Sequence, residues 1–343
     1  MRTRHTVTVG DARSLPLPDD SVELVVTSPP YPMVEMWDEA FGALDDRVAP
    51  ALDRGDGDAA FDAMHDVLDD AWDEVARVLV DGGIACVNVG DATRTLDSFE
   101  LYPNHERVVR AFRERGFDQL PGVLWRKPTN SAAKFMGSGT LPPNAYVTLE
   151  HEHVLVFRNG RRRSFPPGDD DRYGAAYFWE ERNEWFSDLW TDIRGKRQAL
   201  DGDARERSAA FPLELPFRLI NMYSAYGDTV LDPFWGTGTT TTAAMVAGRH
   251  SVGVERLPDL VDAFREHTDE VPGLSTAIQS ERLDDHRAFV DARREDGDTP
   301  GYDATYYDFP VVTKTERDIR LYAVDDVEPT PDGYVADHTR LEQ

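Results

Sequence analysis

The chain has little of what a secreted or membrane protein would need. Its 343 residues contain one cysteine, Cys86, which excludes a disulfide framework and is expected to be a small core residue. No stretch is long and apolar enough to span a membrane, and the N-terminus lacks the apolar core of a signal peptide. His151 and His153 have no second ligand pair at metal spacing, so no metal site is predicted. We therefore expect a cytoplasmic protein.

Lysine is also scarce, and acidic residues dominate the charge. Lys and Arg total 37 against 64 Asp and Glu, which gives a net charge of −27. Such a chain would repel nucleic acid at ordinary ionic strength. In molar salt the Debye length falls to about 3 Å, and acid-rich, lysine-poor chains are typical of organisms that keep such salt inside the cell. The composition predicts a halophilic archaeon as the source, with a merely acidic mesophilic surface as the alternative. The lysines are Lys127, Lys134, Lys196 and Lys314.

A short apolar segment near the start leads into a proline-rich loop. Residues Val22–Val26 are mostly β-branched, which predicts a buried strand, and the loop Thr27-Ser28-Pro29-Pro30-Tyr31 follows its carboxyl end. Open α/β sheets bind ligands at the carboxyl ends of their strands. Two prolines also stiffen any extended segment, so an ordinary loop is the alternative interpretation.

A second motif lies about 200 residues downstream. Thr229–Leu231 is a predicted strand, the glycine turn Asp232–Gly238 follows, and Thr239–Ala247 is a predicted helix. Glycines let a backbone approach a cofactor closely, and a helix start offers free N–H donors. The next predicted strand, His250–Glu255, ends in an acid about 20 residues after the turn, where it can accept both hydroxyls of a ribose.

Together these motifs resemble those of site-specific DNA methyltransferases that modify cytosine N4 or adenine N6. The catalytic motif precedes the cofactor motif, which is the order of the permuted beta group of that family. Gly10-Asp11-Ala12 and Phe211–Pro216 match further family segments, and the matching pieces run from about Thr6 to about Phe264. The resemblance implies an α/β fold of the Rossmann-like class I methyltransferase type. Its sheet would be mostly parallel and closed by an antiparallel hairpin.

The resemblance also implies S-adenosylmethionine as the cofactor. It assigns Glu255 to the ribose hydroxyls and Asp11 to the adenine end, although Asp11 could instead simply form a turn after Gly10. The glycines and the aromatic ring of the turn would form the floor beneath the methionine, and its carboxylate would meet the methionine ammonium directly or through water. The expected residues of this part are Asp232, Phe234, Gly236, Gly238 and Thr239.

The proline-rich loop is expected to carry the catalysis. The Ser28 hydroxyl and the Pro29 carbonyl would hold the exocyclic amine and aim its lone pair at the methyl group. Pro30 would fix that carbonyl, and Tyr31 would stack on a base flipped out of the duplex. Catalysis would then rest on proximity, orientation and electrostatics, without a metal or a covalent intermediate.

Serine at position 28 favours cytosine N4 as the target, because the adenine enzymes of the family more often have Asp or Asn there. The alternatives are an adenine-N6 enzyme, a homologue that binds DNA and cofactor without turnover, and an enzyme acting on RNA or protein glutamine. The expected partners are double-stranded DNA and, as a candidate, a cognate restriction endonuclease.

The resemblance and the charge distribution together divide the chain into regions, because the family places its target-recognition segment between the late strands of the sheet and the cofactor half. We expect a catalytic domain over residues 1–290, with a small inserted target-recognition region at 159–196, and a C-terminal extension over 291–343. Residues 119–200 carry twelve basic and ten acidic residues, a balance of +2 in a chain of −27. Basic residues there alternate with aromatic ones, which suits either nucleic-acid contact or core packing. Residues 38–62 are predicted to form a mobile loop over the pocket or a salt-adapted insertion, and 130–146 a flexible stretch near the target base.

Overall fold

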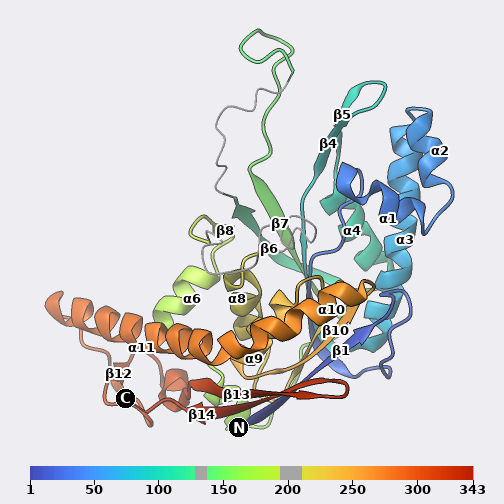
Figure 1. The fold of residues 1–343 in the computed structure, drawn as a ribbon. Helices are drawn as coiled ribbons and strands as arrows, with labels where there is room; N and C mark the ends of the chain where they lie inside the picture. Colours follow the sequence, from blue (N-terminus) through green and yellow to red (C-terminus); the bar gives the residue numbers. More distant parts are fainter. Residues whose placement is uncertain (128–136, 194–210, 343) are drawn as a thin grey trace.

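The computed structural model describes residues 1–127, 137–193 and 211–342. Within these residues one sheet has ten strands in the order β13-β14-β1-β10-β9-β2-β3-β7-β6-β8 (Figure 1). Its five central strands are parallel to one another. They are β1 (Arg2–Val9), β10 (His250–Glu255), β9 (Thr229–Asp232), β2 (Val22–Thr27) and β3 (Leu79–Val89).

An antiparallel pair closes the sheet beyond β3. Strand β7 (His151–Arg158) runs antiparallel to β3, and β6 (Asp118–Arg126) runs antiparallel to β7. The short strand β8 (Leu189–Trp190) then pairs with β6. The predicted mostly parallel α/β sheet with a closing hairpin is therefore confirmed.

Helices cover both faces of the sheet because its strands are apolar on both sides. Val25 of β2 belongs to a core cluster with α3 and α4, whereas Leu24 and Val26 belong to a second cluster on the opposite face. The first face is covered by α3 (Gly57–Val78) and α4 (Asn104–Glu114), and the second by α8 (Glu214–Tyr223), α9 (Thr239–Ala247) and α11 (Val271–Glu295). Within the described residues, no helix is both long enough and apolar enough to cross a membrane.

The segment predicted as a mobile loop, residues 38–62, is helical instead. It contains α1 (Asp38–Gly42), α2 (Val48–Asp53) and the first turns of α3. The acidic residues and glycines of this segment suggested a loop, but Phe41, Val48 and Ala51 are buried and join the core cluster around α3. Burial of these few apolar side chains holds the short helices in place.

The chain beyond residue 290 continues the main sheet. Helix α11 crosses residue 290, and β14 (Gly333–Arg340) pairs antiparallel with β1 and with β13 (Tyr322–Thr330). Smaller elements complete the fold. They are η1 (Glu35–Trp37), β4 (Ala92–Thr95), β5 (Phe99–Tyr102), α5 (Asp170–Gly174), α6 (Trp179–Trp185), α10 (Pro258–Phe264), η2 (Arg265–Glu270), β11 (Tyr302–Asp303), β12 (Pro310–Val311) and η3 (Lys314–Asp318).

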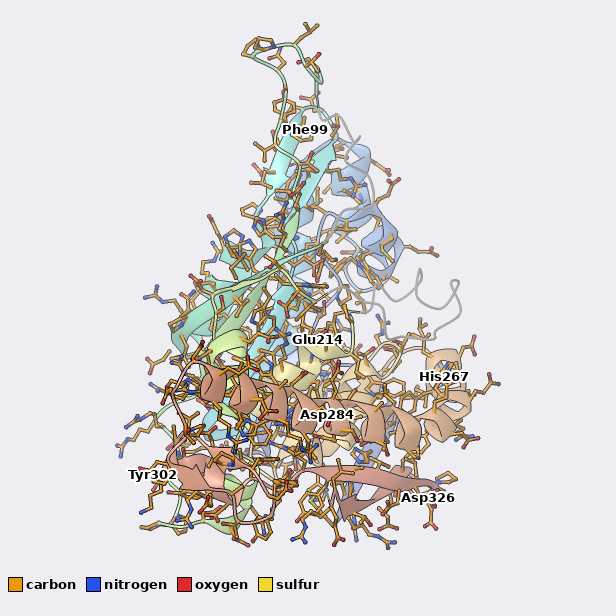
Figure 2. The ribbon with its side chains drawn as sticks, turned by 90° about the vertical axis from the view of Figure 1, so that its left-hand side faces the viewer. Phe99, Glu214, His267, Asp284, Tyr302 and Asp326 are labelled. Carbon is orange, nitrogen blue, oxygen red and sulfur yellow. The ribbon has the colours of Figure 1, made fainter. Side chains whose placement is uncertain are left out.

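The molecule tapers away from this C-terminal base. Figure 2 shows Tyr302 and Asp326 at the broad end and Phe99, in the β4–β5 hairpin, toward the narrow end. The described segment 137–150 projects in the same direction, and Tyr146 stacks on Phe99 with ring centroids 4.5 Å apart. The first part of the stretch predicted to be flexible, residues 130–136, lies outside the described residues.

Candidate active site

A pocket of about 490 Å³ lies at the carboxyl ends of the central strands, where both sequence motifs meet. Strands β2 and β9 are neighbours, with Val25 opposite Leu231, so the loops that follow them open onto the same space. Eight of the eleven predicted site residues line this pocket. They are Asp11, Ser28, Pro29, Pro30, Tyr31, Phe234, Gly236 and Glu255.

Asp232, by contrast, lies behind the pocket wall. Its buried carboxylate accepts hydrogen bonds from the Thr27 hydroxyl at 2.7 Å, the Thr240 hydroxyl at 2.7 Å and the Phe234 N–H at 3.1 Å. It therefore ties the catalytic strand to the glycine turn and to α9. Burial raises its pKa to about 6.

This pKa predicts a pH-dependent stability. Because the folded-state pKa lies above the unfolded value of 3.8, ionising Asp232 destabilises the fold. The stability contributed by protonated Asp232 is fully present below about pH 4. It is lost as the pH rises through about 6, which lowers the free energy of unfolding by about 3 kcal/mol. Urea denaturation of the wild type and of Asp232→Asn between pH 4 and 7 measures this. The difference in unfolding free energy between the two should change across the window, and parallel curves would contradict the assignment.

The second glycine of the turn is required for packing. Gly238 has a φ of +79°, and a Cβ there would lie 2.5 Å from the Phe264 ring. Thr239 is buried at the start of α9. Gly238 and Thr239 therefore stand behind the pocket lining, together with Asp232, while Gly236 reaches it.

Trp235 fills the space between the turn and β10. Its indole is buried, donates to the Thr241 hydroxyl at 2.7 Å and packs edge-to-face on Phe264. A Cβ at Gly253 would overlap the indole ring. The absence of a side chain at Gly253 therefore leaves the space that the Trp235 indole occupies.

We expect Gly253→Ala to lower the free energy of unfolding by about 2 to 3 kcal/mol, because the added methyl group displaces the Trp235 ring. Urea denaturation measures the loss. Gly273→Ala is the matched control, since a Cβ there meets nothing within 4 Å and α11 should be unchanged or slightly more stable. Equal stability of the two variants would contradict the packing described for Trp235.

Two carboxylates line the pocket, one at the end of β10 and one shortly after β1. Glu255 accepts hydrogen bonds from the Gly236 N–H at 2.8 Å and the Leu257 N–H at 2.9 Å, so it also braces the glycine turn. Asp11 accepts from the Arg13 backbone at 3.0 Å and from its guanidinium at 2.9 Å, and this partner lowers its pKa. Asp11 thus forms the turn that was the alternative interpretation and faces the pocket as well.

The proline-rich loop is joined to a polar network that the sequence did not reveal. The Tyr31 hydroxyl lies 2.9 Å from the Ser28 hydroxyl and 3.1 Å from the Glu152 carboxylate. The Asn88 amide donates to Tyr31 at 2.9 Å and to Glu152 at 2.6 Å, and the Lys127 ammonium pairs with the other oxygen of Glu152. Burial and the Glu152 carboxylate raise the pKa of Tyr31 well above 10, so its hydroxyl keeps its proton.

One sequence signal could have found Glu152. It alternates along β7 with Val154 and Val156, which are buried in the cluster that contains Leu24. An acid on the buried face of a strand needs a partner, and such groups gather at functional sites.

His153 belongs to a cluster on the opposite side of β7. Ligand atoms of Asp91, His105 and His153 lie within 4.8 Å of one another. The imidazole rings of His105 and His153 stack with centroids 4.0 Å apart and an interplanar angle of 11°. A single ion therefore cannot lie in both ring planes. The His105 ring bonds the Asp91 carboxylate at 2.8 Å instead.

The helical segment 35–44 covers the pocket opposite the glycine turn. Met36, Trp37, Phe41 and Leu44 contribute to its lining, and Leu257, which is 59% exposed, contributes from beyond β10. These apolar walls suit a flat heterocycle such as adenine or a flipped base.

The proposed recognition segment, 159–196, begins far from the pocket. Arg163 forms a two-bond ion pair with Asp228, which precedes β9 and so lies at the amino ends of the strands. Helix α6 then packs on α11 through the buried Glu181–Arg282 pair. The chain returns toward the pocket edge at β8, and residues 194–196 lie outside the described residues. Among its aromatic side chains Phe178, Trp185 and Trp190 are buried, whereas Trp179 and Phe186 are partly exposed.

Comparison with known proteins agrees with the geometry. A family model described as DNA methylase matches residues 22–266. The type II methyltransferase M.MthZI of Methanothermobacter thermautotrophicus is 47% identical over 328 residues, which cover 94% of this chain and 91% of that protein.

Solved structures are similar as well. The Thermus thermophilus protein TTHA0409 was crystallised with S-adenosyl-L-methionine. It is 33% identical with a TM-score of 0.61, and the match covers 79% of this chain and 97% of that one. The cytosine-N4-specific PvuII DNA methyltransferase shares the fold, with a TM-score of 0.50, 18% identity and coverage of 77% and 86%.

The chain belongs to the N6/N4 DNA methylase family. It is a DNA methyltransferase whose cofactor is S-adenosylmethionine, and its pocket fits that group. Its lining combines carboxylates, which can accept hydrogen bonds from hydroxyls and amines, with apolar side chains, which suit a flat ring.

Proposed function

We propose that the protein methylates the N4 amine of cytosine within a specific sequence of double-stranded DNA. The observation that carries this proposal is the position of Ser28, which lines the pocket together with Phe234, Gly236 and Glu255 of the cofactor half. Serine is the commoner residue at this position among cytosine-N4 enzymes of the family. Adenine N6 is the second candidate, because the pocket volume of about 490 Å³ admits either base.

The catalytic residues orient a poor nucleophile. An exocyclic amine is delocalised into its ring, and hydrogen bonds to the Ser28 hydroxyl and the Pro29 carbonyl would turn its lone pair toward the reacting carbon. Pro30 would fix that carbonyl, and Tyr31 would contact the face of the flipped base. Bound S-adenosylmethionine supplies an electrophilic methyl group. The N–C bond would form as the C–S bond breaks and the thioether leaves, and the proton lost by the amine nitrogen would pass to solvent.

The cofactor residues follow from the same pocket. Glu255 would accept the ribose hydroxyls, and Asp11 would face the adenine end. Phe234 and Gly236 would form the floor beneath the methionine. Asp232, Gly238 and Thr239 support this floor from behind, so we propose that they act on the cofactor through the turn, or through water in the case of Asp232.

Mass spectrometry of nucleosides tests the target base. Duplex DNA is incubated with the purified protein and S-adenosylmethionine in high salt, hydrolysed and analysed. We expect N4-methylcytosine. N6-methyladenine in its place would assign the protein to the second candidate, and cofactor binding without either product would favour a homologue that binds without turnover. RNA and protein acceptors in parallel reactions test the remaining alternatives.

We further propose that residues 159–196 contribute to sequence recognition and that a restriction endonuclease is the cognate partner. The relative named as a type II methyltransferase supports the second point. Methylome sequencing of cells with and without the gene gives the recognised sequence. Protection of that sequence against an endonuclease of the same host tests the pairing.

The net charge of −27 supports a further proposal, that the protein acts in the cytoplasm of a halophilic archaeon. Screening by molar salt would allow an acidic surface to approach DNA. Methyl transfer should then increase with KCl concentration into the molar range. An optimum below about 0.2 M, where salt weakens most protein–DNA complexes, would contradict this.

A further inference from the structure

We propose that Glu152 sets the direction of the hydrogen bonds in the catalytic loop, so that Ser28 presents only acceptor lone pairs to the target base. The site would thereby select a base with an exocyclic amine and reject one with a carbonyl at the same position. This inference rests on the proposed function, because it takes the pocket beside Ser28 as the place of the target base.

The argument begins with the single hydrogen of the Tyr31 hydroxyl. Glu152 can only accept hydrogen bonds as a carboxylate, and its Oε2 lies 3.1 Å from the Tyr31 oxygen, so Tyr31 must donate. The Asn88 amide nitrogen donates to the same Glu152 oxygen at 2.6 Å and to Tyr31 at 2.9 Å. Every hydrogen in this part of the network therefore points toward Glu152 or Tyr31.

The direction of the hydrogen bond between Ser28 and Tyr31 is then fixed. Its oxygen lies 2.9 Å from the Tyr31 oxygen, whose hydrogen is already used, so the Ser28 hydroxyl donates to Tyr31. Only lone pairs of Ser28 remain for the pocket. An exocyclic amine offers an N–H to them, whereas the carbonyl of thymine or uracil would face them with its own lone pairs.

The network is held firmly enough to keep this direction. Glu152 is 7% exposed, and its second oxygen is paired with Lys127. Gly90 packs against it so closely that a Cβ there would lie 3.1 Å from the Tyr31 ring and 3.3 Å from the Glu152 side chain. A buried, fully partnered carboxylate reorients little when the base enters.

The experiment measures binding to three duplexes that share the recognised sequence and differ only at the target base. One carries the natural base, one carries a uracil in its place, and one is abasic. With wild-type protein and the cofactor product S-adenosylhomocysteine, we expect the duplex with the natural, amine-bearing base to bind at least about tenfold more tightly than the duplex with uracil. In Glu152→Gln the ratio should fall below about threefold, because an amide can donate to Tyr31 and release Ser28 to rotate. The abasic duplex should bind both proteins equally.

Glu150→Gln is the matched control. This residue precedes β7, is exposed and pairs with Arg126, so its loss of charge should leave the ratio unchanged. Tyr31→Phe provides a second route if Glu152→Gln does not fold, because it also frees Ser28 and should lower the ratio. Folding is checked by cofactor affinity. A wild-type ratio retained in both variants would overturn the inference, whereas a wild type that methylates no DNA would overturn the proposed function instead.

Discussion

Replacing Ser28 with alanine is expected to lower kcat for methyl transfer about 100- to 1000-fold. The hydroxyl lines the pocket and lies 2.9 Å from Tyr31, so its removal takes away one of the two groups that we propose to orient the amine. Loss of a single preorganised hydrogen-bonding group at a reacting centre typically has an effect of this size. Single-turnover kinetics with a radiolabelled methyl group measures it, and calorimetry measures cofactor affinity, which should stay within about twofold because Ser28 stands on the catalytic side.

Ser21→Ala is the control for this prediction. Ser21 precedes the opposite end of β2, and its hydroxyl donates to the Pro18 carbonyl at the surface. The variant should transfer methyl groups at the wild-type rate. A Ser28→Ala protein with the same kcat as Ser21→Ala would show that the serine does not take part in orienting the amine.

Glu255→Ala is expected to weaken cofactor binding about 100-fold. The ribose hydroxyls would lose the acceptor that we propose for them, and the Gly236 and Leu257 N–H groups would lose the carboxylate to which they donate. Hydrogen bonds to a charged group contribute about 1.5 to 3 kcal/mol each, so losing one or two of them gives a change of this order. Titration calorimetry with S-adenosylmethionine measures the dissociation constant.

Glu266→Ala serves as the comparison, since this exposed acid lies in η2, away from the pocket lining. Its cofactor affinity should equal that of the wild type. Saturating cofactor should restore part of the transfer rate of Glu255→Ala, because the catalytic loop is intact. An unchanged dissociation constant in Glu255→Ala would place the ribose elsewhere in the pocket.

Local sequence patterns were sufficient for the central strands and the helix of the cofactor half. Val22–Val26 and His250–Glu255 are strands as predicted, and α9 spans Thr239–Ala247 as predicted. Each of these elements contains several apolar or β-branched residues, and a glycine, a proline or a charged residue lies at or near its boundary. The meeting of the two motifs followed from one rule, that parallel strands present their carboxyl ends at one edge.

Contacts that depend on strand register could not be predicted from local sequence patterns. Asn88 of β3 lies opposite Val154 of β7, and this antiparallel register is what brings Glu152 next to Asn88 and Tyr31. No local pattern relates residues 31, 88 and 152. The helices between residues 38 and 53 could not be predicted for a similar reason. A few of their apolar side chains pack against α3 and stabilise helices that the acidic, glycine-containing composition does not predict.

The C-terminal hairpin has a consequence for self-association. By covering β1 it leaves β13 as the outer strand, and an uncovered strand is a template on which another chain can add. Several features of β13 oppose such addition. They are the charged residues Asp325, Asp326 and Glu328, a bulge after Val324, and Pro329, which has no N–H to donate. Concentrated salt weakens the repulsion between like charges, but it has no effect on a missing N–H or an irregular backbone. The proline and the bulge would therefore still prevent strand addition in concentrated salt, where charge repulsion alone would not.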